Sequence, residues 1–285
     1  MLCPDPLSNH VPDAPGQLID WARQAGQIAL RYFHNVNAEY KPDHSLLTQA
    51  DLEIERFLTE RVRAAYHDHA LISEEGGRVE DSVPVPDVWA IDPLDGTTAF
   101  AQGLPGWGIS IGLLHEGQPC FGLFYMPLLN DMIYTHGQAD IRCGERSLPQ
   151  AVRSDWGQKG FLAVSASAHY HFQIGVRRTR ALGSVGASLV YTARGSAVAA
   201  FIPKARLWDL VAGAAILARA GGEVRYLSGR SIDYLQLFDG RLAPEPIIAG
   251  HPHLLAELPN LIRPRSPSYF TEQRGSYNQP TAFDP

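Results

Sequence analysis

The stretch Val88-Trp-Ala-Ile-Asp-Pro-Leu-Asp-Gly-Thr-Thr98 joins an apolar strand to a sharp acidic turn. Its first four residues are apolar and typical of a strand that is buried on both faces. Pro93 has no N–H group and fixes its own φ angle, so we expect the strand to end there. Asp92 and Asp95 then lie close together on the turn, where Gly96 permits a backbone geometry that other residues resist.

A helix that begins at Gly96-Thr97 would point its free N–H groups at the same place as the two carboxylates. The N-terminus of a helix is an anion-binding site, because its first N–H groups have no partner within the helix. Hard oxygen ligands beside an anion site suit Mg²⁺ that bridges to a phosphate. Taken alone, the same residues are equally consistent with an Asx turn and a plain helix cap.

Three further segments carry acidic residues at the end of an apolar run or at the start of a helical stretch. Leu71-Ile-Ser-Glu-Glu-Gly-Gly77 places two acids directly after a short apolar run, and adjacent like charges favour either solvation or a bound metal. Asp209 begins a strongly apolar helical stretch, and Asp51 follows Thr48 at the start of another. Each has a plain alternative, which is a solvated loop for the acidic pair and helix capping for the two aspartates.

Composition is that of a globular protein with a sizeable core, since 45% of the 285 residues are hydrophobic and 19% are charged. The net charge of -6 argues against non-specific binding to a nucleic acid polymer or to an anionic membrane. Three cysteines without a CxxC pair favour a reducing, cytoplasmic environment. We find no signal-peptide pattern, and no apolar run approaches the roughly 18–20 residues of a membrane span.

Periodicity predicts mixed α and β structure. Apolar spacing predicts a helix over about 15–33, and Thr48 with Asp51 forms a capping box that opens a second helix. An antiparallel meander is expected from short β-like runs at 71–72, 88–91, 108–114, 121–125 and 132–135. Later elements are a strand at 161–164, a helical stretch near 187–194, a strand at 197–202 and a helix at 209–220 that ends at Gly221-Gly222.

Five motifs follow one another in a recognisable order. They are K-x-D-x-S-x-x-T-x-x-D from Lys41, E-E-G from Glu74, D-P-L-D-G-T-T from Asp92, G-S-x-G from Gly183 and W-D-x-x-A-G from Trp208. Together they resemble the inositol monophosphatase family of lithium-sensitive, magnesium-dependent phosphatases, over roughly residues 15–262. Five ordered motifs are a far stronger signal than one short pattern.

The resemblance implies a fold of α+β and α/β parts, a five-layer αβαβα sandwich of the sugar-phosphatase type. Residues 1–147 would form an α+β half with an antiparallel sheet and most metal ligands. Residues 148–263 would form an α/β half that completes the active site, and residues 264–285 would form a loose tail. The resemblance also implies a homodimer in the cytoplasm.

The resemblance assigns roles to individual residues. The metal ligands would be Glu74, Asp92, the Leu94 carbonyl, Asp95 and Asp209, with two or three Mg²⁺ ions per site. Glu74 and Thr97 would position the attacking water, and Asp51 would support Thr97. The substrate would contact Asp95, Gly96, Thr97, Gly186, Ala187, Ser188 and Asp209. The implied reaction is hydrolysis of a small phosphorylated metabolite by a metal-activated water, similar to inositol-1-phosphate phosphatases.

One departure leaves the substrate open. Inositol-selective members carry a glutamate seven residues before the W-D aspartate, and Ile202 occupies that position here. The candidate reactions therefore include those of fructose-1,6-bisphosphatases, 3'(2'),5'-bisphosphate nucleotidases and histidinol phosphatases. A relative that binds phosphate or metal without turnover is an alternative from a different class.

Two other patterns suggest different chemistry. Gly108-Ile-Ser-Ile-Gly112 matches the G-x-S-x-G nucleophile elbow, but it lies within a continuous β-like run and lacks the required turn. The histidine pairs 67/69, 169/171 and 251/253 could share a strand face and bind zinc. Because no cysteines accompany them, we expect ordinary surface or core histidines.

Overall fold

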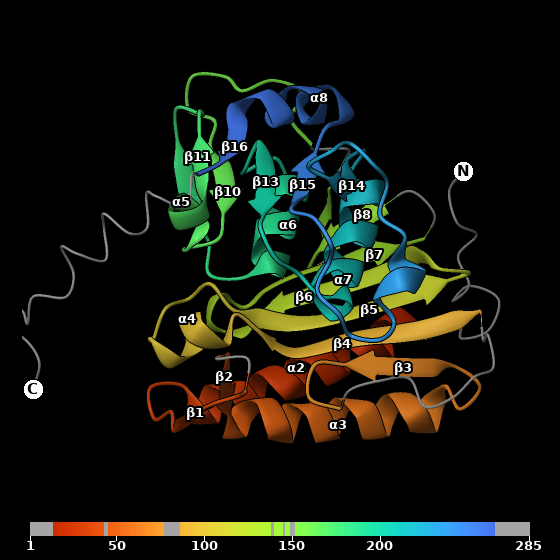
Figure 1. The fold of residues 1–285 in the computed structure, drawn as a ribbon. Coiled ribbons are helices and arrows are strands. Elements are labelled where there is room, and N and C mark those ends of the chain that lie inside the picture. Colours follow the sequence, from red (N-terminus) through yellow and green to blue (C-terminus); the bar gives the residue numbers. More distant parts are fainter. Residues whose placement is uncertain are drawn as a thin grey trace, which may run out of the picture.

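The computed structural model describes residues 14–42, 45–76, 86–137, 140–144, 146–148 and 152–265. Its elements stack in five layers: two helices, a seven-stranded sheet, two further helices, a five-stranded sheet and a last helix (Figure 1). This confirms the αβαβα sandwich that the sequence predicts. The proposed tail lies almost entirely outside the described residues. No helix in the described part of the chain is long and apolar enough to cross a bilayer.

The first layer consists of α2 (Ala14–Tyr32) and α3 (Gln49–Ala65), which pack on each other and on one face of the large sheet. The apolar stripe of α2 is buried, as its helical spacing predicts; it includes Leu18, Trp21, Ala22, Ala25, Ile28 and Ala29. Thr48 is the N-cap of α3 and forms the predicted capping box with Asp51. The sequence prediction is confirmed for both helices.

The second layer is a sheet in the order β3-β4-β5-β6-β7-β8-β9. Its strands are β3 (Ala70–Ser73), β4 (Asp87–Asp95), β5 (Gly108–His115), β6 (Gln118–Met126), β7 (Asp131–His136), β8 (Asp140–Cys143) and β9 (Arg146–Leu148). Pairing from β4 to β7 is antiparallel, as predicted, and β8 and β9 extend the antiparallel part beyond the prediction. The pair β3 and β4 is parallel, so the meander prediction is wrong there. The segment between Ser73 and Asp87 is long enough for the crossover that parallel strands require.

The strand β4 does not end at Pro93, and that prediction is wrong. Asp92 pairs with Ser110 and Asp95 pairs with Gly108, so β4 has one more residue than β5 across this interval. Such a bulge removes Pro93 from the regular ladder, where its missing N–H group would leave a gap. The bulge therefore bends the end of the strand while both aspartates remain part of it.

The third and fourth layers are α6 (Val185–Ala193) with α7 (Leu207–Arg219), and a sheet in the order β12-β10-β13-β15-β14. Its strands are β10 (Leu162–Val164), β12 (Thr179–Ala181), β13 (Ala199–Ile202), β14 (Glu223–Tyr226) and β15 (Ile247–Gly250). The last layer is α8 (Pro252–Leu261), which packs on β15. Smaller elements are β1 (Ala38–Tyr40), β2 (Leu46–Thr48), α4 (Thr97–Ala101), η1 (Pro127–Leu129), α5 (Ala168–His171), β11 (Phe172–Ile174), η2 (Tyr234–Leu237) and β16 (Ile262–Pro264).

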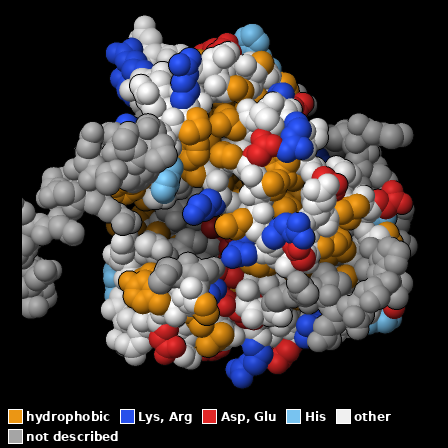
Figure 2. Space-filling model, viewed as in Figure 1, with side chains coloured by type: hydrophobic (Ala, Val, Ile, Leu, Met, Phe, Trp, Pro, Cys, Tyr) orange, Lys and Arg blue, Asp and Glu red, His pale blue; other side chains and the backbone are white. Residues whose placement is uncertain are grey.

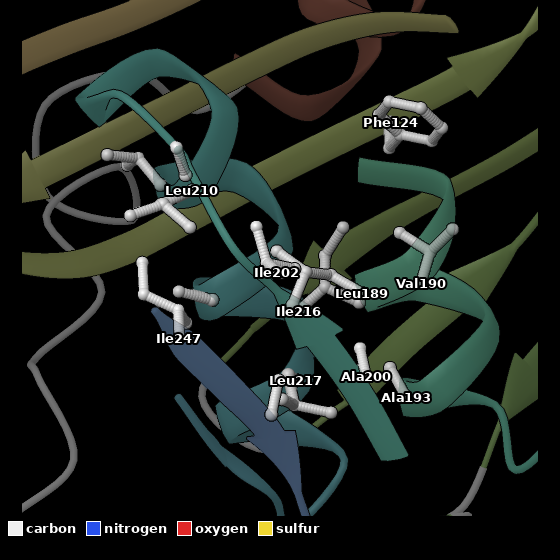
Figure 3. Close-up of a cluster of buried hydrophobic side chains, with 14 of the residues drawn as sticks. Phe124, Leu189, Val190, Ala193, Ala200, Ile202, Leu210, Ile216, Leu217 and Ile247 are labelled. Carbon is white, nitrogen blue, oxygen red and sulfur yellow. The ribbon is translucent and has the colours of Figure 1, made fainter. Parts of the chain in front are cut away.

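The helix α7 lies between the two sheets and is therefore apolar on nearly every face. Figure 3 shows part of this core, in which side chains from α6 and α7 meet Ile202 of β13 and Ile247 of β15. At Gly122 of β6 an added Cβ atom would lie 2.1 Å from the Ala212 carbonyl oxygen, so α7 approaches the sheet backbone closely. This packing fixes the first turn of α7, which carries Asp209.

Candidate active site

Two acid-bearing strands end at the same edge of the large sheet. Because β3 and β4 are parallel, Ser73 lies beside Ile91, and Glu74 follows directly next to Asp92. The Glu74 N–H group donates a hydrogen bond to the Ile91 carbonyl oxygen at 3.2 Å, which continues the ladder by one residue. The unexpected parallel pairing therefore brings together acids from two separate sequence motifs.

Asp92 is buried, with only 2% of its surface exposed. Its Oδ1 atom accepts a hydrogen bond from the Leu94 N–H group at 3.0 Å, which is the Asx turn considered above. Burial raises the pKa of Asp92 well above its usual range, and the charges of Glu74, Asp95 and Asp209 raise it further. These four carboxylates are thus close enough to repel one another, and a cation between them would relieve this repulsion.

Asp95 receives the N-terminus of α6 from the other half of the chain. The N–H groups of Val185 and Gly186 donate to its two carboxylate oxygens at 3.2 and 2.5 Å. Burial raises the pKa of Asp95 to about 6, although these hydrogen bonds act in the opposite direction. An added Cβ atom at Gly186 would lie 2.7 Å from Asp95 Oδ2, so a glycine is needed for this approach.

Asp209 lies in the first turn of α7, where it accepts a hydrogen bond from the Arg206 N–H group at 2.6 Å. Helix capping is therefore part of its role. Burial raises the pKa of Asp209 well above its usual range, and the charges of Asp95 and Glu74 raise it further. A cap alone does not require a carboxylate whose pKa is raised by two other acids, so the capping role leaves this electrostatic arrangement unexplained.

Thr97 and Asp51 are joined across 46 positions of sequence. The Thr97 hydroxyl group lies 3.2 Å from Asp51 Oδ1 and 3.1 Å from the Leu94 carbonyl oxygen. Asp51 is fully buried, and its Oδ2 atom accepts a hydrogen bond from the Thr48 N–H group at 2.7 Å. Burial raises the pKa of Asp51 to about 6. Gly96 precedes α4 with a φ angle of 97°, as the turn prediction requires.

Lys41 forms ion pairs with Glu74 and Glu75, and this contact was not predicted from the sequence. Its Nζ atom lies 2.8 Å from Glu74 Oε1 and 2.5 Å from Glu75 Oε1. Burial raises the pKa of Glu75 to about 7. Burial also lowers the pKa of Lys41, but the two glutamates raise it more, so its ammonium group is held charged. The two adjacent acids after a strand were the feature of the sequence that could have indicated a nearby cation.

The donor atoms fit Mg²⁺ in type, because carboxylates and the Leu94 carbonyl are hard oxygen ligands. Mutual repulsion at Asp92 and Asp209 is also what a divalent cation would relieve. Across the described ranges, no three side chains of His, Cys, Asp or Glu converge closely enough to form a ready cation cage. The residues therefore fit the ion chemically, while Lys41 neutralises Glu74 in this conformation.

The predicted substrate turn lies directly behind Asp95. Gly186 reaches the carboxylate, whereas Ala187 and Ser188 bond within their own helix. The Ala187 N–H group donates to Ser184 Oγ at 3.0 Å, and Ser188 Oγ donates to the Ser184 carbonyl at 2.8 Å. Ala187 and Ser188 are both buried, so of these three predicted residues Gly186 alone bonds directly to Asp95.

The competing patterns have ordinary structural roles. Ser110 is buried inside the straight strand β5, so the G-x-S-x-G match lacks the strand-turn-helix geometry of a nucleophile elbow. His251 accepts a hydrogen bond from the His253 N–H group and so caps α8. His69 Nδ1 accepts one from Trp89 Nε1 at 3.1 Å. Within the residues that the structure describes, no histidine pair contributes to a metal cluster.

Charged side chains of both signs occupy one face of the molecule. Figure 2 shows Lys and Arg side chains near the middle of this face, with Asp and Glu side chains beside them. A pocket of about 580 Å³ lies elsewhere, at the far end of α7, where Ala218 and Arg219 line it. It is separate from the acidic group, because Asp209 lies at the opposite end of that helix.

Fold and site define a class: an alternating sandwich in which Asp209 of α7 lies near the buried carboxylates Asp92 and Asp95. The sequence pattern of the Inositol monophosphatase family matches residues 16–261. The chain belongs to this family.

Named relatives fall into two groups. The chain is 30% identical over 252 residues to the Nus factor SuhB of Escherichia coli K12, covering 82% of this chain and 90% of that protein. It is 28% identical over 218 residues to a fructose-1,6-bisphosphatase/inositol-1-monophosphatase of Thermotoga maritima, covering 73% and 82%. It also resembles in fold an IMPase/NADP phosphatase crystallised with Mg²⁺ and phosphate, with a TM-score of 0.73, 16% identity and coverage of 88% and 95%.

Proposed function

We propose that this protein hydrolyses a small phosphate monoester with magnesium and an activated water. The observation that carries the proposal is the proximity of Glu74, Asp95 and Asp209 to the buried Asp92, beside the hydrogen bond between Thr97 and Asp51. The four acids come from three separate parts of the chain, and the charges of Glu74, Asp95 and Asp209 add to the effect of burial in raising the pKa of Asp92. Mutually destabilised carboxylates are costly to keep and are typical of functional sites.

The proposed metal ligands are Glu74, Asp92, the Leu94 carbonyl, Asp95 and Asp209, with two or three ions per site. When bound, Mg²⁺ would neutralise phosphate charge, lower the pKa of a bound water and stabilise the leaving alkoxide. Hydrogen bonds from Val185 and Gly186 hold the Asp95 carboxylate in a fixed orientation. The N–H group of Arg206 does the same for Asp209.

Thr97 is proposed to orient the attacking water together with Glu74. A hydroxyl group has one hydrogen to donate and two lone pairs that accept. Since Asp51 and the Leu94 carbonyl both accept the single Thr97 hydrogen, the lone pairs of its oxygen would be available to accept a hydrogen bond from water. Asp51 supports this orientation from its buried position and does not itself need to reach the substrate.

The phosphate is proposed to lie against the N–H groups of Gly96 and Thr97, where α4 begins. Asp95, Asp209 and the turn Gly186-Ala187-Ser188 would border the leaving-group side. Inositol 1-phosphate is the first candidate substrate, by likeness to relatives that bear the phosphatase name. Sugar bisphosphates, nucleotide 3'-phosphates and histidinol phosphate are the other candidates, because Ile202 provides no carboxylate for inositol hydroxyls. A homodimer and lithium inhibition are part of the same proposal.

Phosphate release from a panel of esters tests the proposal. Inositol 1-phosphate, fructose 1,6-bisphosphate, adenosine 3',5'-bisphosphate and histidinol phosphate would each be assayed with Mg²⁺, with EDTA, and with Mg²⁺ plus Li⁺. Release that requires Mg²⁺ and is lost in Asp92→Asn supports the reaction class. Release that survives EDTA, or that persists in this variant, would contradict it.

A binding role without turnover is the second candidate. It is favoured by one observation, the name Nus factor borne by relatives such as that of Escherichia coli. The net charge of -6 disfavours direct, non-specific contact with a nucleic acid polymer. Binding of both Mg²⁺ and inorganic phosphate, measured by calorimetry, without hydrolysis of any ester in the panel would support this second candidate.

A further inference from the structure

Glu55 is a buried acid that the proposed mechanism does not use. It lies one helical turn after Asp51 on α3 and is only 9% exposed. Its Oε1 atom accepts a hydrogen bond from Ser73 Oγ at 2.5 Å. Its Oε2 atom is buried and has no hydrogen-bond partner among the residues that the structure describes. Burial of a carboxyl group with incomplete pairing is unfavourable, so a purely structural role explains it poorly.

The partner of Glu55 lies directly beneath the acidic turn. Ser73 is the fully buried last residue of β3, and Glu74 follows it. At Gly76 an added Cβ atom would lie 2.6 Å from Glu55 Oε1 and 2.7 Å from Ser73 Oγ. The turn from Glu74 to Gly76 therefore folds tightly over the Glu55–Ser73 hydrogen bond, and α3 supports it from below.

We propose that Glu55 is a positioning residue that orients Glu74 through Ser73. This inference rests on the proposed function in so far as Glu74 is a magnesium ligand. The helix α3 would then serve the site twice, since Asp51 orients Thr97 and Glu55 orients the turn that carries Glu74. A side chain that acts through a metal ligand without touching the ion typically changes metal affinity when it is removed.

The test uses the full chain and the variants Glu55→Ala, Ser73→Ala and Glu55→Gln. Magnesium binding is measured by calorimetry with MgCl₂ alone, beside thermal unfolding and turnover. Glu55→Ala and Ser73→Ala should each weaken Mg²⁺ binding by about 10-fold, and the double variant should lose little more. Glu55→Gln keeps an acceptor for Ser73 and should lie between wild type and Glu55→Ala.

Thr59→Val is the matched control. Thr59 is buried on the same helix, but its hydroxyl group donates only to backbone carbonyls of α3, at 2.8 Å for Glu55. It should lower the unfolding temperature without changing Mg²⁺ affinity. If Ser73→Ala behaves like Thr59→Val, the role of Glu55 is structural and the inference is wrong. Ser73→Ala removes a single oxygen atom, so it carries the test even if Glu55→Ala fails to fold.

The outcomes for the proposed function and for Glu55 are separable. If the wild-type chain hydrolyses an ester and the variants bind Mg²⁺ as tightly as wild type, only the role of Glu55 is wrong. Wild-type Mg²⁺ binding without turnover of any ester contradicts the proposed function, while the calorimetry of the variants still decides the role of Glu55. If the wild-type chain binds no Mg²⁺, both proposals are wrong.

Discussion

The Thr97 hydroxyl group lies 3.2 Å from Asp51 Oδ1, and this contact joins the start of α4 to the first turn of α3. Asp51 is fixed from its other side by Thr48, so its carboxylate cannot turn away from Thr97. The pair thus links a capping box, which is a local structural motif, to the proposed water site. A capping residue with a second partner outside its helix is better explained by a role in the site than by capping alone.

Thr97→Val should remove the acceptor for the attacking water while keeping the shape of the side chain. We expect kcat to fall by at least about 100-fold at saturating Mg²⁺, because a positioned polar group at the reacting water has an effect of this order. Thr97→Ser keeps the hydroxyl group and should stay within about 10-fold of wild type on the same basis. Equal activity of the valine and serine variants would contradict the assigned role.

Asp92→Asn should abolish turnover and leave the fold intact. The amide keeps the acceptor for the Leu94 N–H group but removes a charge that burial and three neighbouring acids destabilise. Loss of a metal ligand worth several kcal/mol corresponds to a decrease of more than about 100-fold in kcat. Without metal, the variant should unfold at the same temperature as wild type or higher. A lower unfolding temperature in EDTA would show that the native carboxylate is stabilised by contacts rather than strained.

Stability without metal should decrease as pH rises from about 4 to about 6. Asp51 and Asp95 both have a pKa of about 6 in the folded chain, against about 3.9 for an unfolded aspartate. Over this range the unfolded state releases its protons first, so the folded state binds more protons and loses stability as pH increases. Thermal unfolding in EDTA at a series of pH values measures the effect.

Added Mg²⁺ should counteract that loss. Binding requires ionised carboxylates, so the rise in unfolding temperature on adding Mg²⁺ should be larger at pH 8 than at pH 5. At a free ion concentration of about 100 times Kd, the gain is about 2.7 kcal/mol. Asp92→Asn is the control and should lose most of the shift. An equal shift at both pH values would mean that the ion stabilises the fold at some other site.

Ile202→Glu should not convert the chain into an inositol-selective enzyme. Ile202 is only 3% exposed and packs in the core between the sheets, opposite Ile247 of β15 (Figure 3). A carboxylate there would be buried without a partner, at a cost of several kcal/mol. We expect a lower unfolding temperature and an unchanged preference among the esters. Ile202→Val is the control and should cost about 0.5–1.5 kcal/mol. Improved kcat/KM for inositol 1-phosphate in Ile202→Glu would contradict this view.

Local features of the fold could be predicted from sequence, because they depend on neighbouring residues. The apolar stripe of α2 and the capping box at Thr48 are both readable within a few positions, and both are confirmed. Strand direction is not local, so the parallel pairing of β3 with β4 was missed. The prediction that the strand ends at Pro93 was also wrong. A bulge depends on pairing with a neighbouring strand, here β5, and sequence periodicity does not reveal that partner.

The same distinction holds for the candidate site. The acids were found because each lies at the end of an apolar run or at the start of a helical stretch, but their mutual arrangement depends on contacts across the whole chain. Lys41 lies 33 positions before Glu74, and Ser73 lies 18 positions after Glu55. Neither pair leaves a periodic signal. The burial of Ile202 could not be predicted from the sequence either, because a β-branched residue in a short strand fits a core face and an exposed face alike.

Gly186→Ala tests whether the second half of the chain must approach Asp95 as closely as it does. The added methyl group would lie 2.2 Å from a ring carbon of Phe124 and 2.7 Å from Asp95 Oδ2, so α6 or the carboxylate must move. Overpacking of this kind costs about 1–3 kcal/mol. A displaced Asp95 should also weaken Mg²⁺ binding by about 10-fold, as disturbed metal-site support typically does.

Gly16→Ala is the matched control, because no described residue lies within 4 Å of a Cβ atom at that position on α2. It should leave Mg²⁺ binding unchanged and stabilise the chain by up to about 1 kcal/mol, as alanine does in a helix. Calorimetry with MgCl₂ and thermal unfolding of both variants give the comparison. Unchanged Mg²⁺ affinity in Gly186→Ala, together with lost stability, would mean that α6 supports the core but not the orientation of Asp95. Loss of both properties would make the N-terminus of α6 part of the metal site.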